Sequence, residues 1–271
     1  MMSITAAVAL TLAACADPDA LKEPPSEAEL TAITRRGRDL AGYDAAAWHA
    51  SDAVMVKKPK PGSVGGYIAR KTGKGWVVAF GRLDEKKAKY LIAYEAARGN
   101  RPEEFAVEAF DPPRADTGFF LSAARAIETS LKDFTEHFEG ERRPYNVAVL
   151  PTEQGRLWVY LVPAPTKPGV WPLGGDVRYL ISSDGKSIVG KRRLHKSVIE
   201  VERPEGEDQR PVAGVHTHVL DETPEDTDVF HVLTRKPAVP ELIRTEHFLF
   251  VVEADGGITF SGKAEEVSKE R

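Results

Sequence analysis

Cys15 is the only cysteine in this chain of 271 residues, and this restricts what can hold the fold together. A single thiol cannot form a disulfide within the chain. Residues 16–271 offer neither a cysteine ligand for zinc nor a cysteine nucleophile. Burial of apolar side chains must therefore stabilise the fold, and an apolar fraction of 42% is enough for a packed core. Any metal ion would need histidine and carboxylate ligands.

The residues before Cys15 form an apolar run from Ile4 to Leu12 that leads through two alanines into the cysteine. The stretch Leu12-Ala13-Ala14-Cys15 resembles the lipobox of bacterial lipoproteins, in which the cysteine is acylated and becomes the new N-terminus. The resemblance implies a signal peptide over residues 1–15, lipidation at Cys15 and a tether over residues 16–25. It also implies a lipid-anchored protein of the bacterial cell envelope. Ala16 resembles the outer-membrane pattern, so we expect the periplasmic face of that membrane.

An ordinary N-terminus with a single cysteine is the alternative interpretation. It stays open because residues 1–12 contain no Lys or Arg, whereas a secretory signal normally carries positive charge before its apolar run. No later stretch is apolar over the length that spans a bilayer. We therefore expect lipid, rather than a helix, to hold the protein at the membrane.

The charge of the chain argues against a general nucleic-acid binder. Its formal net charge is −4, whereas such binders present a basic surface. Three basic clusters are short, lack an aromatic pattern for base stacking and are explained as solvated surface: Arg35-Arg36, Lys57-Lys58-Pro59-Lys60 and Lys191-Arg192-Arg193.

Residues 26–112 are predicted to form a small N-terminal α+β domain. Ser26-Glu27-Ala28-Glu29 is a capping-box pattern, and apolar residues at helical spacing continue to about Ala50, which predicts a helix. The pattern then changes to that of strands, near residues 67–80, 90–96 and 105–110, with a hairpin turn at residues 72–75. Asp111-Pro112-Pro113 marks a candidate domain boundary.

Residues 113–271 are predicted to form a second, mixed α/β domain. Its strongest signal is a helix from Phe120 to Phe138, with apolar residues three and four positions apart. A proline-rich loop is predicted at residues 163–175. Further strands are predicted at 145–150, 157–162, 176–182 and 212–220, and residues 187–202 are long enough for one bent strand or two. A short helix is predicted at 224–233 and a closing hairpin at 248–260. The whole chain is therefore expected to belong to the α+β class.

His216-Thr217-His218 is the clearest candidate for chemistry. Side chains two positions apart on a strand point to the same face, so both imidazoles can approach one ion. Thr223-Pro224-Glu225-Asp226 follows as a helix start and places Asp226 in the first turn. Two histidines and one carboxylate form a normal zinc set that leaves one position for water. We therefore predict a metal site of His216, His218 and Asp226 that holds zinc, with Asp228 as the alternative carboxylate.

This arrangement resembles the JAB/MPN-like (JAMM) metalloprotease superfamily, whose motif is His-x-His at a strand end, a loop, and Ser-x-x-Asp opening a helix. Thr223 stands where the family has its serine, and Val219 replaces a proline. The resemblance covers the C-terminal half and implies a JAB/MPN-like domain over residues 113–271. It also implies hydrolysis of a peptide or isopeptide bond, with Glu141 as the general base and Thr223 as hydrogen-bond donor to the reacting carbonyl. Glu153 is the second choice for the base.

Two functions are compatible with these patterns. The first is a lipid-anchored envelope protein of scaffold or interaction type, whose JAB-like domain recognises an envelope protein or peptide. The second is a zinc-dependent peptidase or isopeptidase. We prefer the first because Glu141 lacks the family's surrounding pattern, and because each histidine of the pair could instead bond to a carbonyl or carboxylate. His195 and His231 are expected to be surface or core histidines, although His195 could reach a carboxylate and His231 could turn toward the same pocket.

Overall fold

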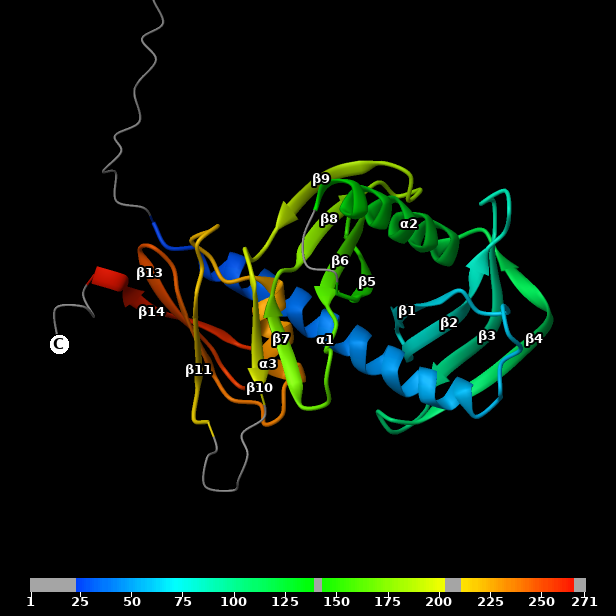
Figure 1. Cartoon of the computed structure of the whole chain (residues 1–271), viewed down its shortest axis with the longest axis horizontal. Coiled ribbons are helices and arrows are strands. Elements are labelled where there is room, and N and C mark those ends of the chain that lie inside the picture. Colours follow the sequence, from blue (N-terminus) through cyan, green and yellow to red (C-terminus); the bar gives the residue numbers. More distant parts are fainter. Residues whose placement is uncertain (1–22, 139–142, 203–210, 266–271) are drawn as a thin grey trace, which may run out of the picture.

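The computed structural model describes residues 23–138, 143–202 and 211–265 (Figure 1). These residues form three helices and several mainly antiparallel sheets, so the predicted α+β class is confirmed at that level. Cys15 and Glu141 lie outside the described residues. Within the described residues, no helix is both long enough and apolar enough to cross a membrane.

The first helix, α1 (Glu27–Met55), runs through the middle of the molecule and contacts elements from both halves of the chain (Figure 1). It starts as predicted, because Glu29 N donates to Ser26 Oγ at 3.3 Å and Ser26 N donates to Glu29 Oε2 at 2.8 Å. The helix continues five residues beyond the predicted end at Ala50. Gly37 lies within it where α3 approaches closely, since a Cβ there would meet Val229 Cβ at 2.4 Å.

The first sheet is antiparallel, with strands in the order of the chain: β1 (Gly66–Thr72), β2 (Gly75–Leu83), β3 (Tyr90–Arg98) and β4 (Phe105–Asp116). Asp111-Pro112-Pro113, the predicted boundary, lies inside β4 rather than in a linker. The division into two domains at residue 112 stays a prediction. Apolar clusters combine residues from both sides of it, among them Ile68 and Ile92 with Leu161 and Tyr179.

The second sheet contains β5 (Tyr145–Pro151), β6 (Leu157–Pro163), β8 (Val177–Ile181) and β9 (Ile188–Arg193), all antiparallel and in that order. Helix α2 (Phe119–His137) packs against it and against the first sheet. Its apolar stripe faces the shared core in part: Phe120 and Ala124 are buried there, whereas Leu131 is exposed.

Two strands form a separate pair at the edge of the second sheet. The predicted proline-rich loop contains β7 (Val170–Gly174). Residues 187–202, for which one bent strand or two were predicted, form two strands, β9 and β10 (Val198–Glu202). β10 pairs with β7 instead of continuing beside β8. The chain therefore turns between β9 and β10, and His195 lies in this turn.

The last sheet holds β11 (Gly214–Thr217), β12 (Glu241–Arg244), β13 (Phe248–Val252) and β14 (Ile258–Lys263). β11 and β12 are parallel, and helix α3 (Asp226–Thr234) belongs to the connection between them. Leu30 and Ile33 of α1 join α3, β12 and β13 in one apolar cluster. This packing fixes the start of α3 beside the end of β11.

Candidate metal centre

Four buried side chains converge between β9, β11 and α3. His195, His216, His218 and Asp228 each offer one ligand atom, and these atoms all lie within 4.8 Å of one another. Exposed surface is at most 8% for each of the four residues. The group could hold a metal ion, since neutral imidazole nitrogens and a carboxylate oxygen are normal ligands of divalent metals.

The distances between the ligand atoms suit a tetrahedral ion. His218 Nε2 lies 3.0 Å from His195 Nε2 and 3.1 Å from His216 Nε2. Asp228 Oδ1 lies 3.0 Å from His195 Nε2 and 3.2 Å from His216 Nε2. Around tetrahedral zinc, with metal–ligand distances of about 2.0–2.1 Å, neighbouring ligand atoms are separated by about 3.3 Å. The four side chains are thus already at nearly the spacing that one such ion requires.

The sequence produces this convergence through three local structures. His216 lies in β11 and His218 just beyond its end, where His218 N donates to Arg244 O at 2.8 Å and so keeps the strand alignment. The two imidazoles therefore share a face, as their spacing predicted. Asp228 occupies the first turn of α3, and its Oδ2 accepts from Glu225 N at 2.6 Å. His195 comes from the turn after β9.

Each imidazole is oriented by an acceptor at its other nitrogen. His195 Nδ1 lies 2.8 Å from Asp176 Oδ1, His216 Nδ1 2.9 Å from Glu241 Oε1, and His218 Nδ1 2.9 Å from Thr223 O. Carbonyl and ionised carboxylate oxygens only accept hydrogen bonds, so each Nδ1 carries the hydrogen. The three Nε2 atoms are then the ones left for a metal, in the arrangement that surrounds metal-bound histidines generally.

One buried atom in the cluster lacks a hydrogen-bond donor. Asp228 Oδ1 is inaccessible to solvent and accepts no hydrogen bond from the described residues, although two imidazole nitrogens are close to it. A buried carboxylate oxygen without a donor costs free energy. Coordination to a cation would satisfy this atom.

The charges around the cluster also favour a divalent ion. Asp176, Asp228 and Glu241 contribute three negative charges, and Arg235, whose Nη1 lies 2.6 Å from Glu241 Oε2, contributes one positive charge. With neutral imidazoles the set carries a charge of −2, which one divalent cation balances. Buried charges are tolerated only when they are compensated in this way.

The pKa shifts of the histidines and of Asp228 also indicate surroundings that stabilise positive charge. Burial alone would lower the pKa of His195, but the charges of Asp176 and Asp228 outweigh it and raise that pKa well above its usual value. For His216, burial is likewise outweighed by Asp228 and Glu241, which raise the pKa to about 9. Burial would raise the pKa of Asp228, yet the imidazoles of His218 and His195 hold it well below the ordinary range. The surroundings therefore stabilise positive charge at the Nε2 positions.

Asp226, the predicted carboxylate ligand, points elsewhere. Its Oδ1 accepts from Arg36 Nε at 2.9 Å, and its Oδ2 accepts from Tyr160 Oη at 2.7 Å and from Arg178. The structure places Asp228 beside His216 and His218 instead, which corrects the predicted set to the alternative carboxylate. The reason is helical geometry: residues two apart on a helix point about 200° apart, so the two acids face opposite sides of α3.

The remaining predicted site residues have other positions. Thr223 contributes its carbonyl oxygen to His218, while its Oγ1 lies 3.4 Å from Asp221 Oδ1. Glu141 lies outside the described residues. Glu153 forms an exposed ion pair with Arg35 at 2.9 Å. The prediction for His231 holds in part, because it is buried on α3, where Arg235 Nη1 approaches its Nε2 at 3.3 Å.

His195 is the member of this group that residue spacing could not identify. It lies 21 residues before His216, in a different strand pair, and only the turn between β9 and β10 brings it to the cluster. Its nearness to Asp176 is equally a product of the fold, because Leu194 N donates to Asp176 O at 3.0 Å across the sheet. The one signal in the sequence was the absence of cysteine from residues 16–271, which leaves histidines as the nitrogen or sulfur ligands of any zinc site in that part of the chain.

A hollow of about 260 Å³ adjoins the cluster. It is lined by His195, His216 and His218 together with Ile199 and Leu220, whereas Asp228 lies behind the imidazoles. Among the described residues that line this hollow there is no carboxylate to serve as a general base. The arrangement can therefore bind an ion and present its histidine side to this small hollow, whose described lining has no carboxylate to activate water.

Comparisons with protein-family models, with curated proteins and with solved structures found no match to this chain.

Proposed function

We propose that this protein is a zinc-binding protein whose ion is held by His195, His216, His218 and Asp228. The observation that carries the proposal is the convergence of three Nε2 atoms and one carboxylate oxygen while each Nδ1 is bonded to an acceptor. Zinc is favoured over harder ions because the donor set contains three imidazoles and one carboxylate, which together make the four ligands that zinc usually takes.

Four protein ligands favour a structural role for the ion. Structural zinc sites are closed by four protein side chains, whereas catalytic sites usually keep one position for water. Here the ligands come from the turn after β9, from the end of β11 and from α3. A bound ion would therefore fasten the C-terminal sheet and α3 to the second sheet, and its binding free energy would add to the stability of the fold.

For the whole chain, we propose a lipid-anchored envelope protein of scaffold or interaction type with a JAB/MPN-like C-terminal domain. Support for the anchor comes from Leu12-Ala13-Ala14-Cys15. Support for the domain type comes from the order of elements, with α2 followed by strands, the His-x-His strand β11, the short helix α3 and the hairpin β13–β14. The partner would be an envelope protein or peptide.

A zinc-dependent peptidase or isopeptidase is the second candidate, and the hollow beside the three imidazoles is the observation in its favour. In that case zinc would supply a Lewis acid for the reacting carbonyl and a water of lowered pKa. His195 and Asp228 would have to leave room for that water, and a base would have to come from Glu141 or another residue outside the hollow. The closed ligand set makes the scaffold function the better supported of the two.

Metal analysis of the purified protein tests the proposal. We expect about one zinc per chain in the wild type, and loss of most of it in His195→Ala and in His216→Ala. His137→Ala is the matched control, because His137 is an exposed histidine on α2 that contacts Asp133 rather than the cluster. Wild-type protein without stoichiometric divalent metal, or His195→Ala protein with its full metal content, would contradict the proposed site.

Cleavage assays separate the two candidate functions. Metal-loaded protein would be incubated with peptide and isopeptide substrates, beside His216→Ala protein. We expect no metal-dependent cleavage. Cleavage that requires the metal and His216 would replace the scaffold function by the hydrolase.

A further inference from the structure

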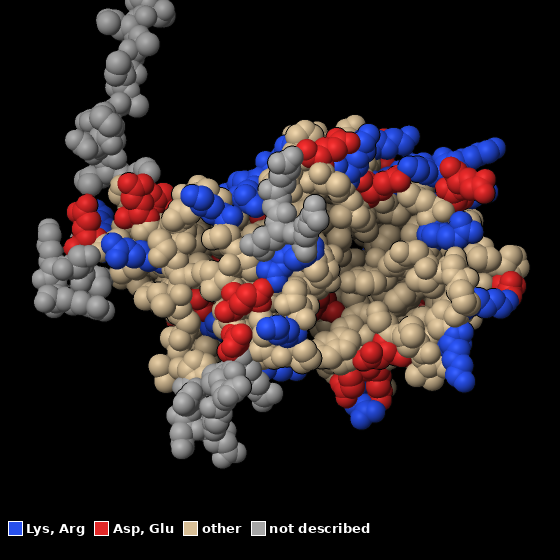
Figure 2. All heavy atoms as spheres, viewed as in Figure 1, with Lys and Arg blue, Asp and Glu red and all other residues tan. Residues whose placement is uncertain are grey.

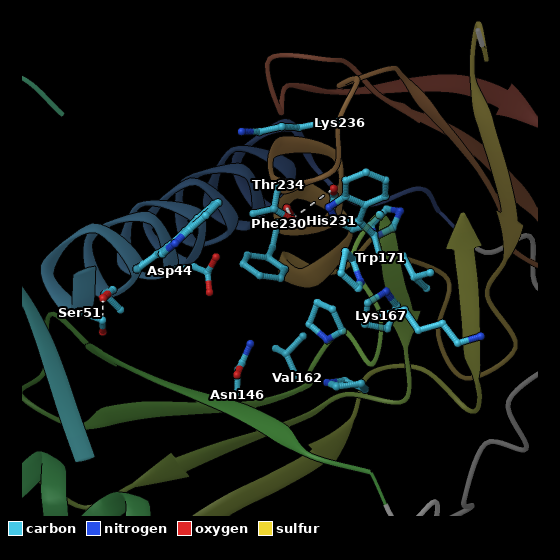
Figure 3. Close-up of a pocket in the computed structure, with 18 of the residues that line it drawn as sticks. Asp44, Ser51, Asn146, Val162, Lys167, Trp171, Phe230, His231, Thr234 and Lys236 are labelled. Carbon is cyan, nitrogen blue, oxygen red and sulfur yellow. Dashed lines mark hydrogen bonds between the residues drawn. The ribbon is translucent and has the colours of Figure 1, made fainter. Parts of the chain in front are cut away.

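A second hollow, of about 550 Å³, opens between α1, α3 and the segment from β6 to β7, away from the metal cluster (Figure 3). Uncharged atoms line most of a hollow at the centre of the face in Figure 2, with acidic atoms deep within it. A volume of this size is typical of sites for small organic molecules. Its residues have no part in the metal cluster.

Aromatic and proline side chains form the walls. Trp48 and Tyr67 contribute from the side of α1 and β1, Trp171 from β7 and Phe230 from α3. Trp48 is 60% exposed, which is unusual for so large an apolar side chain with a hollow beside it. The remaining wall includes four prolines: Pro163, Pro165, Pro168 and Pro172. Such walls can pack against the apolar body of a ligand. The faces of the aromatic rings can also attract a cation.

Asp44 is the charged group inside these walls. It lies on α1 and faces the hollow on the same side as the ring of Phe230 (Figure 3). Among the described residues its carboxylate has neither a hydrogen-bond donor nor an ion-pair partner. Asp226 on α3, in contrast, is paired with Arg36. A desolvated carboxylate without a donor costs free energy, and burial raises its pKa accordingly.

We propose that this hollow binds a small organic ammonium ion, with the positive group at Asp44 and the apolar body against Trp48, Trp171 and Phe230. The unpaired carboxylate supplies the counter-charge that the ligand needs, and the ligand supplies the donor that the carboxylate lacks. Aromatic rings around the same space add cation–π attraction. The inference does not depend on the metal centre.

Two lysines at the hollow do not neutralise Asp44. Lys236 Nζ lies over the ring of Trp48, 5.9 Å from its centroid. The amine of Lys167 extends away from Asp44 (Figure 3). Neither forms an ion pair with the carboxylate. An anionic ligand would meet the lysines at the rim but would be repelled by Asp44 at depth, so the position of the charges favours a cation inside.

Calorimetric titration with three probes of similar shape tests the charge of the ligand: 2-phenylethylammonium, the neutral 2-phenylethanol and the anionic 3-phenylpropionate. We expect the ammonium ion to bind about tenfold more tightly than the other two, since it alone can pair with the carboxylate. Equal binding of the alcohol, tighter binding of the carboxylate, or no binding of the ammonium ion at millimolar concentration would overturn the proposal.

Asp44→Asn tests the residue, because it removes the charge while keeping the size of the side chain. Asp52→Asn is the matched control, an exposed acid on the same helix. We expect Asp44→Asn to weaken ammonium binding about tenfold and to leave 2-phenylethanol unaffected, while Asp52→Asn changes neither. Unchanged ammonium binding in Asp44→Asn would refute the assignment.

Thermal unfolding without ligand provides a second measurement, which distinguishes a binding role of Asp44 from a purely structural one. Neutralising an acid with a structural role lowers the stability of the protein, whereas an unpaired, half-buried charge kept for binding destabilises the ligand-free protein. We therefore expect the Tm of Asp44→Asn to rise at neutral pH, and a lowered Tm would contradict the proposed role.

Discussion

Removal of the metal should lower the stability of the protein, and replacement of His195 should abolish most of that effect. His195 is one of the four side chains whose ligand atoms converge, and its Nδ1 lies 2.8 Å from Asp176 Oδ1. At free zinc of 1,000 times the Kd, binding stabilises the folded state by about 4.1 kcal/mol. For a chain of this size about 2–4 °C of Tm accompany each kcal/mol. Zinc should therefore raise the Tm of chelator-treated wild type by about 8–16 °C.

The variants should show a graded loss of this zinc-dependent shift. If His195→Ala weakens binding about a thousandfold, zinc at the same concentration adds only about 0.4 kcal/mol, which is a shift of about 1 °C. Asp176→Asn keeps the ligand but loosens its orientation, a change that typically costs 10–100-fold in affinity, or about 1.4–2.7 kcal/mol. Its shift should be intermediate.

Differential scanning fluorimetry measures the Tm of each protein after chelation and again after zinc is restored. The comparison of each variant with its own chelated state separates loss of metal binding from a general folding defect. His137→Ala, which changes an exposed histidine, should keep the wild-type shift. A full zinc shift in His195→Ala would refute the four-ligand set and favour a site of two histidines and one carboxylate.

Three further predictions concern packing and charge. Asp226→Asn should lower the free energy of unfolding in urea by about 3–5 kcal/mol, because it leaves Arg36 and Arg178 without their buried counter-charge. The zinc content should remain that of wild type. Loss of zinc would restore Asp226 as a ligand. Gly37→Ala should destabilise by about 1–3 kcal/mol, since the new Cβ would lie 2.4 Å from Val229 Cβ, whereas Gly190→Ala, with no atom within 4 Å, should be nearly neutral in the same assay. The stability gained in Asp44→Asn should depend on pH: burial raises the pKa of Asp44 above 3.8, so the wild type loses stability as pH rises from about that value through the folded-state pKa. The two proteins should be equally stable below about pH 3.8, and a gain that persists there would exclude ionisation as its cause.

The sequence predicted local elements well where one periodicity dominates. The capping box at Ser26 and the apolar stripe of α2 have local causes, so their spacing is sufficient. β7 and β12 were missed for different reasons. β7 carries proline and glycine within a proline-rich segment, and β12 is a strand of only four residues, too short for a clear alternating pattern. Asp111-Pro112-Pro113 has the composition of a linker but lies within β4, at a register shift between Ala109 and Arg114, which both pair with β3.

Half of the metal cluster could be predicted, again because one periodicity dominates locally. His216 and His218 are two apart on one strand, so their shared face follows from the pleat. The choice between Asp226 and Asp228 depends on the rotation of α3, which Arg36 and Arg178 fix by pairing with Asp226. The position of His195 depends on where β9 ends, and the pairing within the second sheet determines that end.

Anomalous diffraction from crystals grown with zinc, recorded on both sides of the zinc absorption edge, tests the central claim most directly. We expect a single strong zinc peak about 2.0–2.2 Å from His195 Nε2, His216 Nε2, His218 Nε2 and an oxygen of Asp228. No peak between these four side chains, or a peak that His195 and Asp228 do not approach, would contradict the proposed centre.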